Sequence, residues 1–385
     1  MKVTSDPGLL AEIRKYGKFD TNACFQCGSC TVICDLTNDS ASFPRRIIRY
    51  ALMGLRKPLL SGLEPWLCYY CGDCSTTCPR QTEPGEAMMT LRRYLTAKYD
   101  WTGISSKIYR SKAWEIGALF FVGAFVLLLA GLYHVSVVGL PFPEFTTIPM
   151  GLEHMFGMIS VFTWCVFLIP LVFLISNAVR MYWLTMHTND EVNIPFSLYF
   201  AEAKTLLLQV FMQERYRECA DKNRWIKHLL LVSGCGLISF LVLFFLEWFQ
   251  TDNIYPIYHP QRWLGYLATV AIIYATGDIL IGRIRKREQI HKFSDLSDWI
   301  LPILLLLTTV TGIAVHIFRY LELSLASHYM YALHLVIVVP MLVVEIPFGK
   351  WSHMLYRPLA MYFLTVKEKA LQQQLPKEEI VEHVE

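Results

Sequence analysis

The chain has 385 residues, of which 54% are hydrophobic and 17% charged, and its formal net charge is +3. The overall charge is uninformative, whereas its distribution along the chain is not, and we expect no nucleic-acid partner. No nucleophilic triad or phosphate-binding loop is found, so we do not expect the chain alone to convert a soluble substrate. Residues 1 to about 105 are polar and rich in cysteine, whereas long apolar runs dominate from about residue 113 onward.

Eight of the eleven cysteines form two runs near the N-terminus, each with the pattern C-x2-C-x2-C-x3-C. This spacing is typical of proteins with two [4Fe–4S] clusters, in which the fourth cysteine of each run ligates the other cluster. For the first cluster the pattern predicts the ligands Cys24, Cys27, Cys30 and Cys78. For the second cluster it predicts Cys68, Cys71, Cys74 and Cys34.

Zinc and disulfides are the alternative uses of these cysteines. Zinc sites usually take two separated pairs of ligands rather than one dense run. Disulfides are typical of small secreted domains, and we find no signal peptide ahead of the cysteines. Residues 44–54 and 86–98 have the periodicity of short amphipathic helices, so we expect cluster loops on a small helical scaffold. Cys165 and Cys235 stand in apolar runs as packing residues, and Cys219 is isolated.

The second part of the chain contains six apolar runs long enough to cross a membrane as helices. We therefore predict an all-α protein, with a small helical ferredoxin-like domain followed by a six-helix transmembrane cytochrome b bundle. The expected domains are residues 1–105 and 106–365, with a polar tail over 366–385. The expected spans are approximately 114–138, 155–179, 227–249, 263–282, 299–320 and 329–348.

The distribution of Lys and Arg predicts the orientation of the bundle. Most basic residues lie between spans two and three and between spans four and five, whereas 139–154 and 321–328 contain none. Basic loops face the cytoplasm. We therefore expect the iron–sulfur domain and both termini on the cytoplasmic side of the inner membrane. The amphipathic segment 194–224 is expected to lie along the inner membrane surface.

Histidines within membrane helices are candidate haem ligands, because haem b takes its two axial ligands from facing helices. His316 and His334 are equally distant from the turn near Leu325, so we expect them at equal depth as ligands of an outer haem. His228 and His353 lie at the inner face and are the predicted ligands of an inner haem. His154 is the alternative for the outer haem, together with His134.

The stretch HLVIVVPMLVVEIPFGKWSHMLYRP, from His334 to Pro358, resembles the last membrane helix of the nitrate reductase gamma subunit family. In that family two histidines at similar spacing bind the two haems b, which implies this role for His334 and His353. The spacing here is 19 residues, where 18 is expected in that family. The family's companion helix carries two histidines ten residues apart; His228 matches the first, but Ile238 stands at the second position.

The N-terminal third resembles the small iron–sulfur subunit of heterodisulfide reductase, through the two cysteine runs and the intervening PRRIIRYALMGL. The membrane part is similar to the cytochrome b subunit of the same systems. Both parts in one chain with six spans resemble the QmoC family. This family forms the membrane subunit of the quinone-interacting membrane-bound oxidoreductase complex of sulfate-reducing prokaryotes.

This resemblance implies that the chain takes electrons from menaquinol through two haems b and two [4Fe–4S] clusters. The implied acceptors are two soluble flavin and iron–sulfur subunits of the same complex, linked to adenylylsulfate reductase. The alternatives are the same conduit in a heterodisulfide or sulfite-reduction complex, or a membrane anchor with clusters and no haem. Polar groups near the spans are candidates for quinone contacts or proton release, namely Asp278, Arg319, Glu322 and Tyr331.

Overall fold

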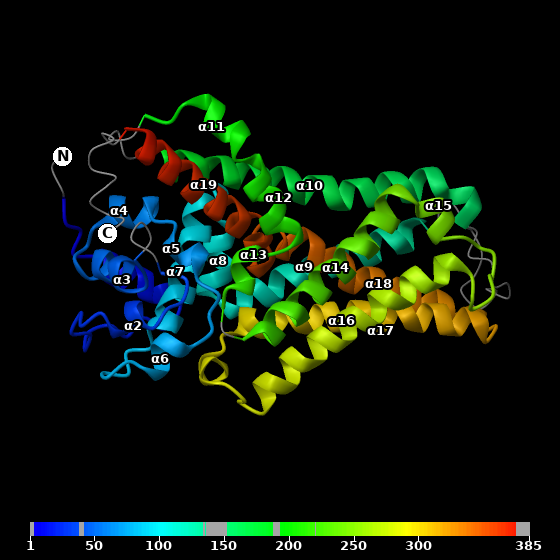
Figure 1. Cartoon of the computed structure of the whole chain (residues 1–385). Helices are drawn as coiled ribbons and strands as arrows, with labels where there is room; N and C mark the ends of the chain where they lie inside the picture. Colours follow the sequence, from blue (N-terminus) through cyan, green and yellow to red (C-terminus); the bar gives the residue numbers. More distant parts are fainter. Residues whose placement is uncertain are drawn as a thin grey trace.

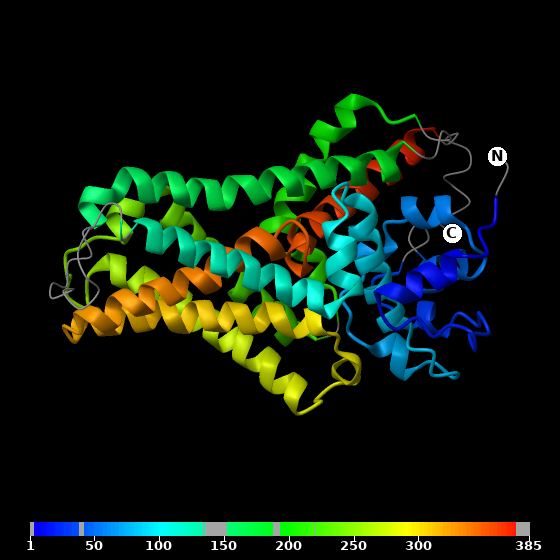
Figure 2. The same ribbon diagram turned by 180° about the vertical axis from the view of Figure 1, so that it is seen from behind.

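The structure is a computed structural model that describes residues 4–37, 42–133, 135, 152–187, 193–219 and 221–374. Within these ranges the chain is all-helical, as predicted, and contains no β-strand. An N-terminal unit of short helices sits at one end of a bundle of long helices (Figure 1). The view from behind shows the same two parts, with the unit against the end of the bundle (Figure 2).

The N-terminal unit is built around one long buried helix. This helix, α7 (Pro84–Tyr99), begins with a proline, whose fixed φ suits the first turn of a helix. The amphipathic helix α3 (Arg45–Leu52) packs Ile47, Ile48 and Ala51 inward and keeps its arginines on the other side. Both helices form where the sequence predicts them, but only α3 is amphipathic, because α7 is buried on nearly all of its faces. The other helices are α1 (Leu9–Ile13), α2 (Ser29–Val32), α4 (Arg56–Ser61), α5 (Glu64–Leu67), α6 (Asp73–Thr76) and α8 (Ile104–Arg110).

Six helices in the described part of the chain are long and apolar enough to cross a membrane. They match the predicted spans, with ends that shift by a few residues, and they leave many large apolar side chains exposed on their outer surfaces. In chain order they are α9 (Lys112–Tyr133), α10 (Leu152–Met186), α14 (Lys222–Phe244), α16 (Pro260–Ile284), α17 (Leu296–Tyr320) and α18 (Ser324–Pro340), which a π-helical turn (Met341–Glu345) extends.

The last span is interrupted near Pro347. After the π-helical turn the chain leaves the helix, forms a short 3-10 turn over Lys350–Ser352, and starts a new helix at His353. This helix, α19 (His353–Gln374), runs away from the bundle and along the N-terminal unit (Figure 1). It continues into the segment expected as a polar tail, and buries Val366 and Ala370 there.

The two basic connections of the bundle both contact the N-terminal unit. The connection between spans two and three forms α11 (Phe196–Ala201), α12 (Ala203–Phe211) and α13 (Glu214–Arg217), and Arg215 donates to the carbonyl oxygen of Leu36 at 2.7 Å. In the connection between α16 and α17, the carbonyl oxygen of Ile290 accepts a hydrogen bond of 3.3 Å from the Tyr70 hydroxyl. Both basic connections therefore lie on the same side of the bundle as the cysteines.

Candidate functional site

The two cysteine runs fold into loops with nearly the same backbone. Gln26 and Tyr70, two residues after the first cysteine of each run, have φ values of 55° and 56°. Gly28 and Gly72 follow the second cysteine and have φ values of 91° and 98°, a conformation that favours glycine. One helical turn, α2 or α6, then carries the third cysteine. Each loop thus wraps three sulfur atoms around one point.

The cysteines assigned to the first cluster line one shared cavity with Arg45 and Arg80. Burial raises the pKa of Cys30 to about 11, and the thiols that raise it further are the other three of this set. Gln26 donates to the Sγ atom of Cys24 at 3.4 Å. Four sulfur atoms around one cavity, with a hydrogen-bond donor beside them, fit a [4Fe–4S] cluster. The set is Cys24, Cys27, Cys30 and Cys78.

The cysteines assigned to the second cluster also lie together, deeper in the molecule. Burial raises the pKa of Cys34, and the Cys68 thiol raises it further. Burial likewise raises the pKa of Cys74, and four nearby thiols raise it further, namely Cys68, Cys71, Cys30 and Cys34. The backbone N–H of Tyr70 donates to Sγ of Cys68 at 3.3 Å. These electrostatic effects place the fourth cysteine of the first run near the thiols of the second loop, as a crossed ligand set requires.

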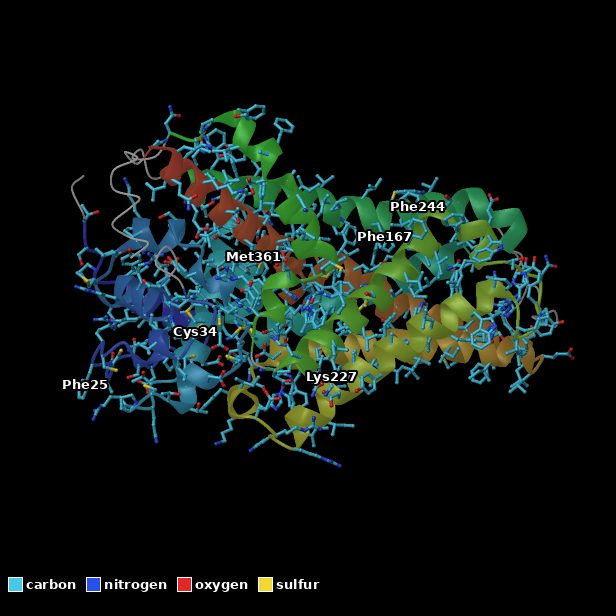
Figure 3. The ribbon with its side chains drawn as sticks, viewed as in Figure 1. Phe25, Cys34, Phe167, Lys227, Phe244 and Met361 are labelled. Atoms are coloured by element: carbon cyan, nitrogen blue, oxygen red, sulfur yellow. The ribbon has the colours of Figure 1, made fainter. Side chains whose placement is uncertain are left out.

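The two cysteine sets differ in exposure and in distance from the bundle. Cys68 and Cys74 are buried, whereas Cys27 is exposed and Phe25 beside it is 71% exposed. Phe25 lies at the tip of the N-terminal unit, and Cys34 lies between this tip and the bundle (Figure 3). The second set therefore faces the membrane helices, and the first set faces solvent.

Three arginines hold the loop of the second cysteine set. Arg92 donates to the carbonyl oxygens of Pro65, at 2.6 Å, and of Cys68. Arg357 donates to the same Cys68 oxygen at 3.0 Å. Arg224 donates to the carbonyl oxygens of Tyr70 and Cys71 at 3.3 and 3.4 Å. Their positive charges offset the negative charge that four thiolates would bring to a buried loop.

His228 and His353 face one another where the bundle meets this loop. Their ring centroids are 6.4 Å apart. His228 donates from Nδ1 to the Gln213 side-chain oxygen at 2.7 Å, and His353 donates from Nδ1 to the carbonyl oxygen of Lys350. Each ring thus keeps its Nε2 lone pair for a metal, with the other nitrogen held as metal-bound histidines require. Burial lowers the pKa of His353 well below its usual value, which favours the neutral imidazole.

The spacing of this histidine pair fits an iron atom between the rings. Two imidazoles that share one metal, each with a metal–nitrogen bond of about 2 Å, would have their ring centroids at a comparable spacing. Each histidine is also one helical turn from an arginine that holds the cysteine loop. Arg224 precedes His228 by four residues on α14, and Arg357 follows His353 by four residues on α19.

An aromatic pair connects the cysteine loop to the histidine pair. Tyr69, which follows Cys68 directly, stacks on Tyr216 with ring centroids 4.2 Å apart and an angle of 17°. Tyr216 in turn makes an edge contact with His228 at 5.5 Å. The guanidinium of Arg357 lies 3.6 Å from the Tyr69 ring centroid. Continuous contact therefore links a cysteine of the second set to a candidate haem ligand.

The structure does not bring His316 and His334 into ring contact within its described residues. His334 approaches Gly312, one turn before His316, and shares a 3.0 Å hydrogen bond with Thr311. The Thr311 hydroxyl already donates to Leu307, so His334 donates from Nδ1 and keeps Nε2 open. His316 bonds through Nε2 to the hydroxyl of Tyr266 at 2.8 Å. Its role as an outer ligand stays a prediction.

The remaining candidate histidines and polar groups have varied surroundings. His134 and the side chain of His154 lie outside the described residues. Asp278 forms ion pairs with Lys227 and Arg287 at 2.9 and 3.1 Å. Arg319 donates to the carbonyl oxygens of Thr251 and Asp252. Glu322 lies exposed in a turn, and Tyr331 lies on α18. Asp278 and Arg319 thus have structural partners, and the quinone site stays a prediction.

Sequence reasoning missed the residues that join the two parts. The tyrosine pair and the three arginines carry no motif of their own. The position of Cys219 beside the four thiols of the second set was also missed. Burial raises the pKa of Cys219 to about 11, and Cys68 raises it further. The available signal was the four-residue spacing of Arg224 and Arg357 from the predicted haem ligands.

This geometry defines two cysteine loops for iron–sulfur clusters, joined to a six-helix bundle. Residues 20–82 match the family described as a 4Fe-4S dicluster domain, which supports two [4Fe–4S] clusters. A protein of Archaeoglobus profundus that resembles the C subunit of heterodisulfide reductase is 34% identical over 88 residues, or 23% of this chain and 47% of that protein. The C subunit of the ferredoxin:CoB-CoM heterodisulfide reductase of Methanosarcina acetivorans is 33% identical over 81 residues, or 21% of this chain and 32% of that protein.

A third relative is the C2 subunit of the H(2)/formate:CoB-CoM heterodisulfide,ferredoxin reductase of Methanococcus maripaludis. It is 36% identical over 76 residues, or 20% of this chain and 41% of that protein. The chain thus spans about a third to a half of the length of these curated relatives. No solved structure matches the chain.

Proposed function

We propose that this chain is the membrane electron-transfer subunit of an oxidoreductase complex, and that it connects a quinol in the bilayer to soluble partner subunits. The observation that carries this proposal is the unbroken contact from His353 and His228 through Tyr216 and Tyr69 to Cys68. Two haems b and two [4Fe–4S] clusters, when bound, supply one-electron carriers along this line.

The chain's own residues hold and separate these carriers. His228 and His353 would hold the inner haem, with His334 and His316, or alternatively His154, at the outer haem. The arginines at the second cysteine loop offset its charge, and the stacked tyrosines fill the gap to His228 and exclude water. The first set places the exposed Cys27, with Phe25, at the surface where a partner docks. The order is therefore quinol, outer haem, inner haem, second cluster, first cluster and partner.

The proposed donor is menaquinol, and the proposed acceptors are two cytoplasmic flavin and iron–sulfur subunits that serve adenylylsulfate reduction in sulfate respiration. The resemblance to the QmoC family supports this choice. The basic connections on the cysteine side support a cytoplasmic position of the N-terminal unit. The relatives named as heterodisulfide reductase subunits support the second candidate, the same conduit in a heterodisulfide reductase complex.

Reduction by quinol tests the proposal. The complex is solubilised in detergent and mixed with a soluble menaquinol analogue under anaerobic conditions. We expect the haem b absorption bands to appear in their reduced form, followed by the electron paramagnetic resonance signals of reduced clusters. The contrary result would be a chain that contains no haem and whose clusters are reduced by dithionite but not by quinol. It would favour the alternative of a membrane anchor with clusters and no haem.

A further inference from the structure

Two buried carboxyl groups lie at the junction between the bundle and the N-terminal unit, and the electron path described above does not use them. Glu345, at the end of the π-helical turn, is 0% exposed, and Glu115, on the first turn of α9, is 3% exposed. The Oε1 atom of each is buried without a hydrogen-bond partner. An ionised carboxylate with an unpaired buried oxygen is costly, so these groups are poised to bind a proton.

Glu345 is linked to a candidate haem ligand through a single residue. Its Oε2 atom accepts a hydrogen bond of 3.0 Å from the backbone N–H of Lys350. The carbonyl oxygen of the same Lys350 accepts the hydrogen bond from Nδ1 of His353. The ammonium group of Lys350 forms its ion pair with Asp298. Lys350 therefore contacts Glu345 through its backbone N–H.

Tyr109 on α8 connects the two carboxyl groups electrostatically. Burial raises the pKa of Tyr109 well above its usual value, Glu345 and Glu115 raise it further, and Arg93 lowers it. Tyr109 thus interacts electrostatically with all three groups. From α10 the apolar Phe173 packs on Phe348, and the uncharged Asn177 is buried one turn further along.

A network of charged groups leads from this region to solvent. Arg93 on α7 pairs with Asp295 at 2.5 Å, with Asp298 at 3.1 Å and with Glu86 at 3.5 Å. The side chain of Asp295 is 43% exposed. The charged and titratable groups around the carboxyl pair are therefore Tyr109 on α8, Arg93 on α7, Asp295 and Asp298 at the start of α17, and Lys350.

We propose that Glu115 and Glu345 form a proton-binding site that takes up one proton when the inner haem is reduced. The proposal rests on the proposed function, because it places a haem between His228 and His353. Reduction would add one electron to the haem iron, and one proton from the N-terminal side would convert one carboxylate of the Glu115 and Glu345 pair to a carboxylic acid. Oxidation of the haem returns both. The added charge is thus balanced close to the iron, in a region of low dielectric constant where imbalance is costly.

The pH dependence of the inner haem potential tests this inference. The complex is titrated potentiometrically at several pH values, with the haem spectrum as the signal. In the wild-type protein we expect the potential to fall as pH rises, with a slope that approaches about 59 mV per pH unit, the value for a tenfold change in a one-electron couple. Glu345→Gln and Glu115→Gln should flatten this slope. Glu247→Gln, which removes an exposed carboxylate elsewhere in the bundle, should leave the slope unchanged.

A second measurement covers variants that assemble poorly. Redox-induced infrared difference spectra of the wild-type complex should show a protonated carboxyl band that appears on haem reduction and shifts in deuterated water. A haem potential independent of pH, a slope that persists in both glutamine variants, or no carboxyl band would each overturn the inference and leave the electron path intact. A wild-type chain without haem would overturn the proposed function and this inference with it.

Discussion

The ring of Tyr69 stacks on the ring of Tyr216 with centroids 4.2 Å apart. Tyr69 belongs to the second cysteine loop, and Tyr216 belongs to the connection between two membrane helices. Their contact closes the space between Cys68 and His228 with two aromatic rings. The proposed electron path between the membrane and the iron–sulfur unit depends on this pair.

Replacement of Tyr216 should slow electron exchange without loss of cofactors. Tyr216→Leu removes the ring and opens a gap beside His228, so we expect reduction of the second cluster by the haem to slow several-fold. Tyr216→Phe keeps the stacked ring and serves as the matched control, with a rate like that of the wild-type protein. Rapid mixing with quinol and freeze-quench electron paramagnetic resonance measures both rates. Equal rates in the Leu and Phe variants would show that electrons take another route.

Serine replacements should separate the two crossed ligand sets. Cys34→Ser should remove the cluster of the second loop, although Cys34 belongs to the first run. Cys78→Ser should remove the cluster of the first loop. Cys219→Ser should keep both clusters, because Cys219 lies near the second set without belonging to either run. Iron content and electron paramagnetic resonance of the purified complex report these losses, and loss of the first-loop cluster in Cys34→Ser would contradict the assignment.

Arg357 should raise the reduction potential of the second cluster. Its guanidinium donates to the carbonyl oxygen of Cys68, and cluster potentials rise with nearby positive charge and hydrogen bonds. Arg357→Gln should therefore lower the potential of the second cluster and leave the first unchanged. Arg45 lies beside the cavity of the first set, so Arg45→Gln should lower the potential of the first cluster and leave the second unchanged. Redox titration followed by electron paramagnetic resonance distinguishes the two; equal shifts of both clusters in either variant would refute this local effect.

Deprotonation of Glu86 should lower the free energy of unfolding as pH rises. Burial raises the pKa of Glu86 to about 6, against an ordinary value of 4.5. Between these values the folded protein keeps a proton that the unfolded chain has released, so stability falls as pH increases. The loss reaches about 2 kcal/mol above this window. In Glu86→Gln this loss should disappear, which thermal bleaching of the clusters below and above the window would show.

Glu12 provides a control of opposite sign. Burial raises the pKa of Glu12, but its ion pairs with Arg56 and Lys98, both at 2.6 Å, outweigh this effect and lower the pKa overall. Its stabilising contribution is present above the ordinary pKa and is lost as pH falls. Glu12→Gln should therefore lower the bleaching temperature at neutral pH. A pH dependence in Glu86→Gln identical to that of the wild-type protein would show that Glu86 is not its source.

The cysteine loops and the membrane helices could be predicted because their signals are local. Gly28 and Gly72 occupy the same position in two runs of identical spacing, and both take the positive φ that the loop requires. Each membrane helix is likewise encoded by its own apolar run. The ends of the helices were less predictable, as the π-helical turn and the new helix at His353 show.

The contacts that join the two parts depend on tertiary packing and could not be read from local patterns. Tyr69 and Tyr216 meet only because α19 and the connection before α14 return to the second cysteine loop. Arg92 and Arg357 reach the same carbonyl oxygen from helices far apart in the sequence. Depth counting also paired His316 with His334 as ligands of an outer haem, and this pairing stays a prediction; His334 lies beside Gly312, one turn before His316.

The central claim is that His228 and His353 bind a haem that exchanges electrons with the second cluster. Quantification of haem b per chain in the purified wild-type complex and in His353→Ala tests this claim most directly, with His187→Ala, an exposed position, as control. We expect two haems per chain in the wild-type protein and the control, one fewer in His353→Ala, and both clusters in all three. A wild-type chain without haem, or an unchanged haem content in His353→Ala, would contradict the account.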